Sequence, residues 1–185
     1  MKKANTRYRE VAKVISLPVN QNVTIALTDP KSPTNVGAVM RAAGCYQANK
    51  VLYSGIRYAK AAKFQTDTKD VSNKIPLEHV DDFLEDKPDD VKVICVDLVE
   101  GATPLPEFIH PEKAIYIFGP EDGTISQAVV DSADSVVYVP TIGCMNLAAS
   151  VNVLLYDRLA KSNLTHFSDQ LIKQSRDTNN TVKVK

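Results

Sequence analysis

Short apolar runs alternate with stretches of helical spacing along most of this chain. The runs at 23–27 and 114–118 are continuously aliphatic, β-branched or aromatic, which is typical of strands covered on both faces. In the stretches between runs, apolar residues recur at helical intervals, and Thr34 or Asn35 is placed to cap the first helix. The alternation predicts an α/β fold with a mainly parallel sheet and helices on both faces. We expect strands at 23–27, 50–53, 91–96, 114–118 and 135–139, and helices within 35–48 and at 77–84, 126–132 and 147–160.

The length of 185 residues suits one domain with a full hydrophobic core, so we expect a single domain over 1–185. Its core would span about 22–160, flanked by a basic N-terminal arm and a polar C-terminal tail. No apolar run reaches the roughly 18 residues that a membrane span needs. The start of the chain, MKKANTRYREVAKV, also lacks the apolar centre of a secretory signal. We therefore expect a cytoplasmic protein that does not enter a membrane.

The spacing of cysteines and histidines predicts no metal site. Cys45, Cys95 and Cys144 lie far apart without a CxxC pair, and the three histidines are scattered. This spacing offers none of the usual zinc ligand sets and favours reduced, mostly buried thiols over disulfides. No histidine belongs to a Ser/His/Asp arrangement, so we expect each of them at the surface or at a helix cap.

The formal net charge of zero hides a strong asymmetry. Residues 1–74 contain 13 lysines and arginines against 4 acidic residues, whereas residues 75–157 contain 3 against 16. Because the local field steers an encounter, the basic part can attract a polyanion. Solvated helix faces explain the same charges equally well, and charge alone does not separate the two interpretations.

Three loops that follow expected strands carry unusual residues, at the edge where open α/β sheets bind ligands. In TDPKSPTNVGAVMRAAG, Asn35 begins a helix and Arg41 lies almost two turns inside it, on a related face, so that both could converge on an anion such as phosphate. In FGPEDGTIS, Gly119 and Gly123 flank Glu121 and permit close approach of a ligand to the backbone. In VPTIGCMNLAAS, small residues lead into a long helix and suit a dry pocket lined by backbone.

Each loop also has a plain structural explanation. The first loop is explained by a buried helix with one surface arginine, and the second by a strand-to-helix turn. The third is explained by helix packing through small residues. The sequence contains neither GxGxxG nor GxxxxGK[ST], so it gives no support for dinucleotide or P-loop nucleotide binding.

Together and in this order, the three loops resemble the three motifs of the SpoU/TrmH-type RNA 2′-O-ribose methyltransferases of the SPOUT superfamily. The resemblance covers about residues 22–160. The family's first motif, Asn-x-Gly-x-x-x-Arg, matches Asn35, Gly37 and Arg41. The second motif, built on Phe-Gly-x-Glu with a following glycine, matches Phe118, Gly119, Glu121 and Gly123. Where the third usually has Ile-Pro-Met and then Ser-Leu-Asn-Val-Ser, this chain has Val139, Pro140 and Thr141, then Cys144, Met145, Asn146, Leu147 and Ala148.

The resemblance implies a deep trefoil knot at the C-terminal end of the domain and S-adenosyl-L-methionine as the cofactor. It places the cofactor contacts near Leu98, Gly119, Val139, Cys144 and Met145.

The resemblance also implies a homodimer in which the helix at 147–160 packs at the interface. That helix has enough apolar surface for this role, and internal packing within a monomer is the alternative. The apolar residues concerned are Val151, Val153, Leu154 and Leu155.

A ribose 2′-hydroxyl is a poor nucleophile, so an enzyme of this type must hold its oxygen in line and ease its deprotonation. By resemblance, Arg41 is the central catalytic residue, and a two-pronged grip on the adjacent phosphate suits a guanidinium that stays protonated. Asn35 and Glu121 would orient this arrangement, and Asn146 would brace the third loop. For contact with the RNA backbone we expect Lys31, Arg57, Lys60 and Lys63, together with the terminal arms.

The sequence thus predicts an S-adenosyl-L-methionine-dependent RNA methyltransferase that acts on a ribose 2′-hydroxyl. Transfer RNA is favoured over ribosomal RNA, because the chain has no additional N-terminal recruiting domain. The alternative is a catalytically silent, knotted RNA-binding module, against which the presence of Asn35, Arg41 and Glu121 argues. Methylation of a base would need a different acid or base, and the motifs supply none.

Overall fold

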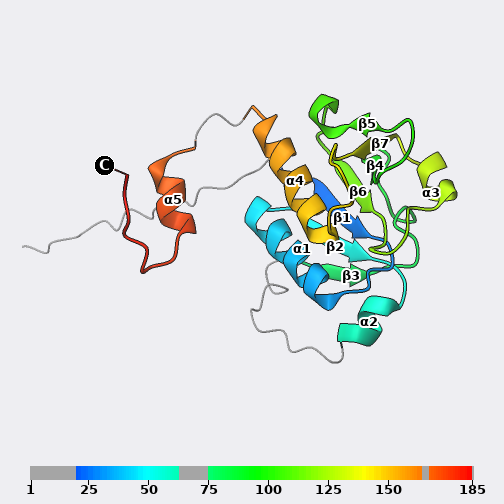
Figure 1. Ribbon diagram of the computed structural model, residues 1–185, viewed down its shortest axis with the longest axis horizontal. Helices are drawn as coiled ribbons and strands as arrows, with labels where there is room; N and C mark the ends of the chain where they lie inside the picture. The colour runs from blue at the N-terminus through cyan, green and yellow to red at the C-terminus, as the bar shows by residue number, and fades with distance from the viewer. Residues whose placement is uncertain (1–19, 63–74, 164–166, 185) are drawn as a thin grey trace, which may run out of the picture. The chain divides into compact units, whose positions relative to one another are not determined.

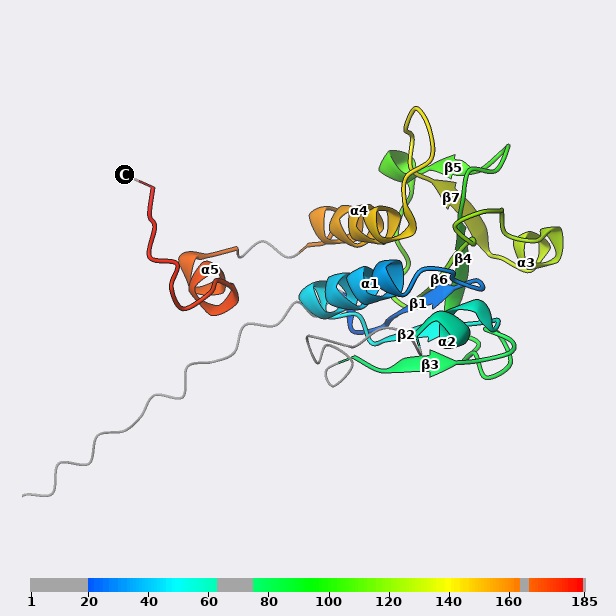
Figure 2. The same ribbon diagram turned by 60° about the horizontal axis from the view of Figure 1, so that its bottom comes forward.

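The computed structural model describes residues 20–62, 75–163 and 167–184. Contacts divide the chain into two compact units, and one of them, Leu17–Asn163, contains the whole sheet and four helices (Figures 1 and 2). The predicted core at 22–160 lies inside this unit. Helix α5, Asp169–Ser175, belongs to the other unit and has no buried residue. The strands are β1 Val23–Leu27, β2 Lys50–Tyr53, β3 Leu77–His79, β4 Lys92–Val96, β5 Thr103–Pro104, β6 Ala114–Phe118 and β7 Ser135–Tyr138, and the other helices are α1 Pro33–Tyr46, α2 Arg57–Ala62, α3 Gln127–Asp131 and α4 Leu147–Ala160.

The strands form a seven-stranded sheet in the order β3-β2-β1-β6-β4-β7-β5. Every pair of neighbours is parallel. The prediction of an α/β fold with a mainly parallel sheet is therefore confirmed. Because all strands run the same way, the loops that follow them emerge at one edge of the sheet. Within the described residues, no helix is long and apolar enough to cross a membrane.

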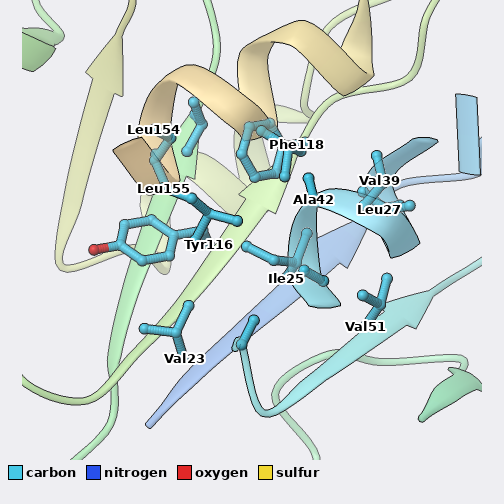
Figure 3. Close-up of a cluster of buried hydrophobic side chains, with 14 of the residues drawn as sticks. Val23, Ile25, Leu27, Val39, Ala42, Val51, Tyr116, Phe118, Leu154 and Leu155 are labelled. Carbon is cyan, nitrogen blue, oxygen red and sulfur yellow. The ribbon is translucent and has the colours of Figure 1, made fainter. Parts of the chain in front are cut away.

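Side chains alternate between the two faces of the sheet, as the pleat requires. On one face, residues of β1 and β6 such as Ile25, Tyr116 and Phe118 pack against α1 and α4. Figure 3 shows Leu154 and Leu155 of α4 meeting this face. The opposite face, with Ala26, Leu52, Val93, Cys95, Ile115 and Ile117, is covered by α3 and by the loop that precedes β4.

Helices α1 and α4 lie side by side on the first face (Figures 1 and 2). Val151, Leu154 and Leu155 are fully buried against the sheet, and Val153 is half-buried. The alternative of internal packing therefore holds for Val151, Leu154 and Leu155, which provide no outer surface for an interface. The exposed aromatic residue of α4 is instead Tyr156, whose relative exposure is 62%.

The helix predicted at 77–84 is wrong. Leu77–His79 is strand β3, which pairs with β2, and residues 80–91 form bends and turns before β4. Val80, Phe83 and Leu84 have helical spacing, but they pack on the second face of the sheet from this irregular loop. Pairing with the open edge of β2 supplies backbone hydrogen bonds that outweigh the weak local helical preference.

The predicted cap of the first helix is also wrong, because the cap is Ser32 rather than Thr34 or Asn35. The Ser32 hydroxyl accepts a hydrogen bond from the Asn35 backbone N–H over 3.3 Å, and Pro33 takes the first helical position. Pro33 needs no amide partner at that position and already has a helical φ, so the helix starts earlier than its apolar spacing indicates.

Candidate functional site

A pocket of about 140 Å³ lies where β4, β6 and β7 end. Its wall is formed by the segments that follow these strands and by the first residues of α4. Three segments distant in the sequence meet here because β6, β4 and β7 are neighbours in the sheet. The lining residues are Val96, Asp97, Leu98, Phe118, Gly119, Pro120, Glu121, Gly123, Val139, Thr141, Cys144, Met145, Leu147 and Ser150.

The structure brings all five predicted cofactor residues to this one pocket. Leu98 follows β4, Gly119 follows β6, and the other three come from the loop between β7 and α4. The second and third loops of the sequence thus share a wall. Their contact with a cofactor stays a prediction.

Asp97 is a lining residue that the sequence analysis missed. Its Oδ1 accepts a hydrogen bond from the Leu98 backbone N–H over 2.8 Å, and its Oδ2 accepts one from the Ile125 N–H over 2.9 Å. Together they tie the end of β4 to the loop after β6. The sequence does carry a signal for Asp97, because an acidic residue stands directly after the predicted strand at 91–96.

Gly119 allows this arrangement because it lacks a side chain. A Cβ placed on Gly119 would stand 2.6 Å from Asp97 Oδ2 and 3.3 Å from the Ile125 backbone nitrogen. Both atoms belong to the same hydrogen bond, so neither can move away without breaking it. The glycine therefore permits the contact that shapes the pocket.

Glu121 joins the second loop to the first. Its carboxylate accepts hydrogen bonds from the backbone N–H groups of Lys31 and Ser32 and from the Asn35 side-chain amide, the last over 2.9 Å. The carboxylate thus lies just before the N-terminus of α1, where negative charge is stabilised. Glu121 therefore occupies the side-chain amide of Asn35, which the sequence analysis offered to an external anion.

Arg41 lies outside the pocket, on the exposed side of α1. It follows Asn35 by six residues, about 120° around an ideal helix axis, so the two side chains leave α1 in different directions. Among the described residues, no hydrogen bond or ion pair engages the Arg41 guanidinium. The structure therefore brings Asn35 and Glu121 together and leaves Arg41 available to a ligand.

Asn146 caps the helix that follows the third loop. Its side-chain oxygen accepts a hydrogen bond from the Ala149 backbone N–H over 2.7 Å. The role of Asn146 in bracing the third loop stays a prediction. Within the same loop, Gly143 has a φ of 92°, and the Thr141 hydroxyl donates a hydrogen bond to its carbonyl over 3.0 Å.

The predicted RNA contacts differ in their surroundings. Lys60 is exposed on α2, and Lys31 is 3.6 Å from Asp122 with a largely exposed side chain. Arg57 forms ion pairs with Asp29 and Asp122, at 2.9 Å and 2.7 Å. The Asp122 hydrogen bond raises the pKa of Arg57, and Arg57 in turn lowers the pKa of Asp122. Lys63 lies outside the described residues.

Among the described residues that line the pocket, the only charged side chains are the carboxylates Asp97 and Glu121. Its other lining side chains are apolar or neutral. In the part of the chain that the structure describes, no group of histidine, cysteine and acidic residues could hold a metal ion.

Comparisons with known proteins agree with the three loops. Residues 22–156 match the model of the SpoU rRNA Methylase family. No curated protein sequence matches the chain.

Solved structures share the fold at low sequence identity. The SpoU methyltransferase AviRb from Streptomyces viridochromogenes in complex with AdoMet has a TM-score of 0.63 and 19% identity, over 78% of this chain and 62% of that one. The A. aeolicus TrmH/SpoU tRNA modifying enzyme has a TM-score of 0.66 and 17% identity, over 88% and 84%. A structure described by the 2-OH methylation of C/U34 on tRNA has a TM-score of 0.64 and 23% identity, over 75% and 89%.

This chain spans between 57% and 62% of the length of AviRb and of the rRNA methyltransferase from Sinorhizobium meliloti. The family match, by contrast, covers most of this chain and includes all three loops, of which the second and third line the pocket. The chain belongs to the SpoU rRNA methylase family.

Proposed function

We propose that this protein is an RNA methyltransferase that uses S-adenosyl-L-methionine and methylates a ribose 2′-hydroxyl. The observation that carries the proposal is the pocket at the ends of β4, β6 and β7, which unites the second and third family motifs. The hydrogen bond between Asn35 and Glu121 attaches the first motif to the same wall.

The pocket residues fit the cofactor in charge and polarity. Val96, Phe118, Val139 and Leu147 supply an apolar wall for an adenine ring. The cofactor carries a sulfonium cation, and the charged side chains among the lining residues are both carboxylates. Gly119 permits the hydrogen bond between Asp97 and Ile125 that shapes the wall of the pocket.

When bound, S-adenosyl-L-methionine supplies an electrophilic methyl group. The protein then has to position the 2′-oxygen and stabilise the negative charge that develops on it. Arg41, exposed and without a partner among the described residues, is the candidate for holding the neighbouring phosphate in a two-pronged grip. Glu121 and Asn35 keep the start of α1 in place.

Transfer RNA is the substrate we favour, and Lys31 and Lys60 are the described residues we expect at the RNA backbone. Two of the similar structures are described in terms of tRNA, one as a tRNA modifying enzyme and one by the 2-OH methylation of C/U34 on tRNA. We also propose a cytoplasmic location.

We propose that the protein acts as a homodimer. Tyr156 of α4 is 62% exposed. A large exposed aromatic residue on this helix suits contact with a second copy. A dimeric mass in light scattering at micromolar concentration is expected, with Tyr156→Arg shifting it towards the monomer. A monomeric wild-type mass would refute this part of the proposal.

A deep trefoil knot is a further part of the proposal. From β4 the chain crosses to the edge strand β5 and returns past β7 and β4 to β6. It then passes β4 again to reach β7, and the following helix α4 packs beside α1. Such overlapping connections are rare in unknotted sheets. When the two ends are pulled apart in single-molecule experiments, a knotted chain remains shorter than its full extended length. Extension to about 3.4 Å per residue would show an unknotted chain.

Calorimetry with S-adenosyl-L-methionine and with its demethylated product tests the cofactor proposal directly. We expect both to bind without added metal. Failure of both to bind the folded protein would favour the catalytically silent RNA-binding module. Mass spectrometric mapping of nucleosides, in RNA from cells with and without the protein, then identifies the methylated position.

A further inference from the structure

We propose that Arg57 is a positioning residue that holds the loop before α1 against the loop after β6, and that it does not bind RNA through its guanidinium. This inference rests on the proposed methyl transfer for its kinetic consequence. Its structural consequence can be measured without that activity.

The Arg57 side chain bridges two segments that the sheet brings together. Its Nη1 donates to both carboxylate oxygens of Asp122, over 2.7 Å and 3.0 Å. Its Nε donates to the Asp29 backbone carbonyl over 2.9 Å and lies 2.9 Å from the Asp29 carboxylate. Nη2 donates to the same carbonyl. The guanidinium donors thus face protein acceptors, and two carboxylates offset its charge.

The segment held by Arg57 has an unusual backbone. Asp29 has a φ of 38°, in the left-handed region that side-chain-bearing residues rarely adopt. Its carboxylate accepts the Arg57 backbone N–H over 3.3 Å, and its own N–H donates to the Ser54 hydroxyl over 3.3 Å. A conformation of this cost persists only where neighbouring contacts hold it.

Gly55 is shaped to this contact. It has a φ of 74°, and a Cβ at this position would stand 2.2 Å from Asp29 Oδ1. The turn between β2 and α2 therefore leaves room for the Asp29 side chain and presents Arg57 to it. Asp29, Gly55, Arg57 and Asp122 thus form one cluster of contacts, which we call the clamp.

The clamp adjoins the groups of the candidate active site on both sides. Asp29 is two residues before Lys31, and Asp122 follows Glu121 directly. Glu121 accepts the N–H groups of Lys31 and Ser32 and the amide of Asn35. Arg57 therefore binds the loop before α1 at Asp29 and the loop after β6 at Asp122, and the same two loops are joined at Glu121. Misplacing these loops would displace the start of α1.

Partly exposed ion pairs add little to global stability, so variants of the clamp are expected to fold. The side chains of Arg57, Asp29 and Asp122 are 31%, 40% and 49% exposed. The effect should appear in the local geometry of the two loops and in the transfer step.

A double-mutant cycle of Arg57→Ala and Asp122→Ala separates positioning from RNA contact. Its first readout is amide hydrogen exchange at Lys31 and Ser32, whose N–H groups bond to Glu121. We expect exchange to be on the order of tenfold faster in each single variant than in the wild type. The double variant should exchange no faster than the single variants, because either substitution alone already breaks the bridge between the two loops. Lys60→Ala, which removes a positive charge from the same helix, should leave this exchange unchanged.

The second readout is methyl transfer to total tRNA at saturating S-adenosyl-L-methionine. A positioning role predicts that both single variants lower kcat by on the order of tenfold, with KM for RNA within about twofold of wild type. Arg57→Lys should not restore kcat, since lysine cannot bridge both partners.

An RNA-binding Arg57 gives the opposite pattern. Arg57→Ala would then raise KM for RNA, while Asp122→Ala, which removes a nearby negative charge, would lower KM or leave it unchanged. That pattern, or unchanged exchange at Lys31 and Ser32, would overturn the inference. Absence of transfer by the wild-type protein would instead refute tRNA as the substrate, and the exchange measurement would still decide the role of Arg57.

Discussion

The side-chain amide of Asn35 donates a hydrogen bond to Glu121 Oε1 over 2.9 Å and joins two loops 86 residues apart in the chain. The same carboxylate accepts the backbone N–H groups of Lys31 and Ser32. One carboxylate thus accepts three hydrogen bonds from residues 31–35, at the start of α1. This is an internal counterpart of anion binding at a helix N-terminus.

Glu121→Gln should weaken this junction. The glutamine amide presents a donor where the carboxylate accepts hydrogen bonds, and the charge-assisted bonds are lost. We expect the free energy of unfolding in urea to fall by about 1.5 to 3 kcal/mol. Glu85→Gln, at an exposed position outside the pocket, is the matched control and should change it little. Equal stability of the two variants would show that the junction contributes nothing.

Gly119→Ala should damage the pocket. The added methyl group would meet Asp97 Oδ2 at 2.6 Å, and the Asp97 carboxylate is held by the Ile125 N–H. Relief of this contact should cost about 1 to 3 kcal/mol in stability and remove cofactor binding in calorimetry.

Gly37→Ala is the control for the glycine substitution, because its Cβ would meet no atom within 4 Å. Gly37 lies inside α1, so alanine should instead raise stability by about 0.5 to 1 kcal/mol. Opposite signs of the two changes in urea denaturation are therefore expected. A tolerated Gly119→Ala would mean that the Asp97 contact is dispensable.

Cys144→Ser tests the departure of the third loop from the family pattern. Cys144 is exposed at the pocket, where serine has a similar shape and forms stronger hydrogen bonds. We expect the rate of methyl transfer to stay within about tenfold, equivalent to about 1.4 kcal/mol in the barrier. Complete loss of transfer in a folded variant would indicate a specific role for the thiol.

The buried His110 should make stability depend on pH. Its ring nitrogens lie 2.7 Å from the Tyr116 hydroxyl and 2.9 Å from Asp157, and burial lowers its pKa although the Asp157 hydrogen bond opposes this. Between the lowered value and the ordinary 6.5, the unfolded chain binds more protons than the folded one. This contribution to stability is therefore complete above pH 6.5 and is lost as the pH falls towards the folded-state pKa.

Urea denaturation across this pH range provides the measurement. His110→Gln should flatten the decline in the free energy of unfolding, whereas the exposed His79→Gln should leave the decline as in the wild type. An unchanged slope in His110→Gln would assign the pH dependence to other groups.

Strands β1 and β6 were predictable because their residues are aliphatic, β-branched or aromatic and nearly all are buried. The sequence predicted β1, β2 and β6 with the bounds that the structure shows, and β4 and β7 within one residue. The edge strands β3 and β5 have three and two residues, too few to show a period, and their pairing depends on a neighbouring strand.

The candidate site was less accessible to sequence reasoning. Residues at the ends of β4, β6 and β7 meet through the sheet order, which no local pattern encodes, so their grouping came from the family resemblance. The missed Asp97 and the clamp around Arg57 show the same limit. Their roles depend on contacts with Ile125 and Asp122, which are distant in the chain.

Arg41→Ala is the variant that most directly tests the proposed chemistry. The Arg41 side chain is exposed on α1 and does not line the pocket, so its removal should leave folding and cofactor affinity unchanged. Methyl transfer should fall by on the order of 100-fold or more, as is common when a preorganised charged donor is lost. Arg41→Lys should not restore it, because lysine keeps the charge without the planar, two-pronged grip. Near-normal turnover of the lysine variant would show that charge alone suffices, and loss of cofactor binding in the alanine variant would place Arg41 at the cofactor and refute the assignment to the phosphate.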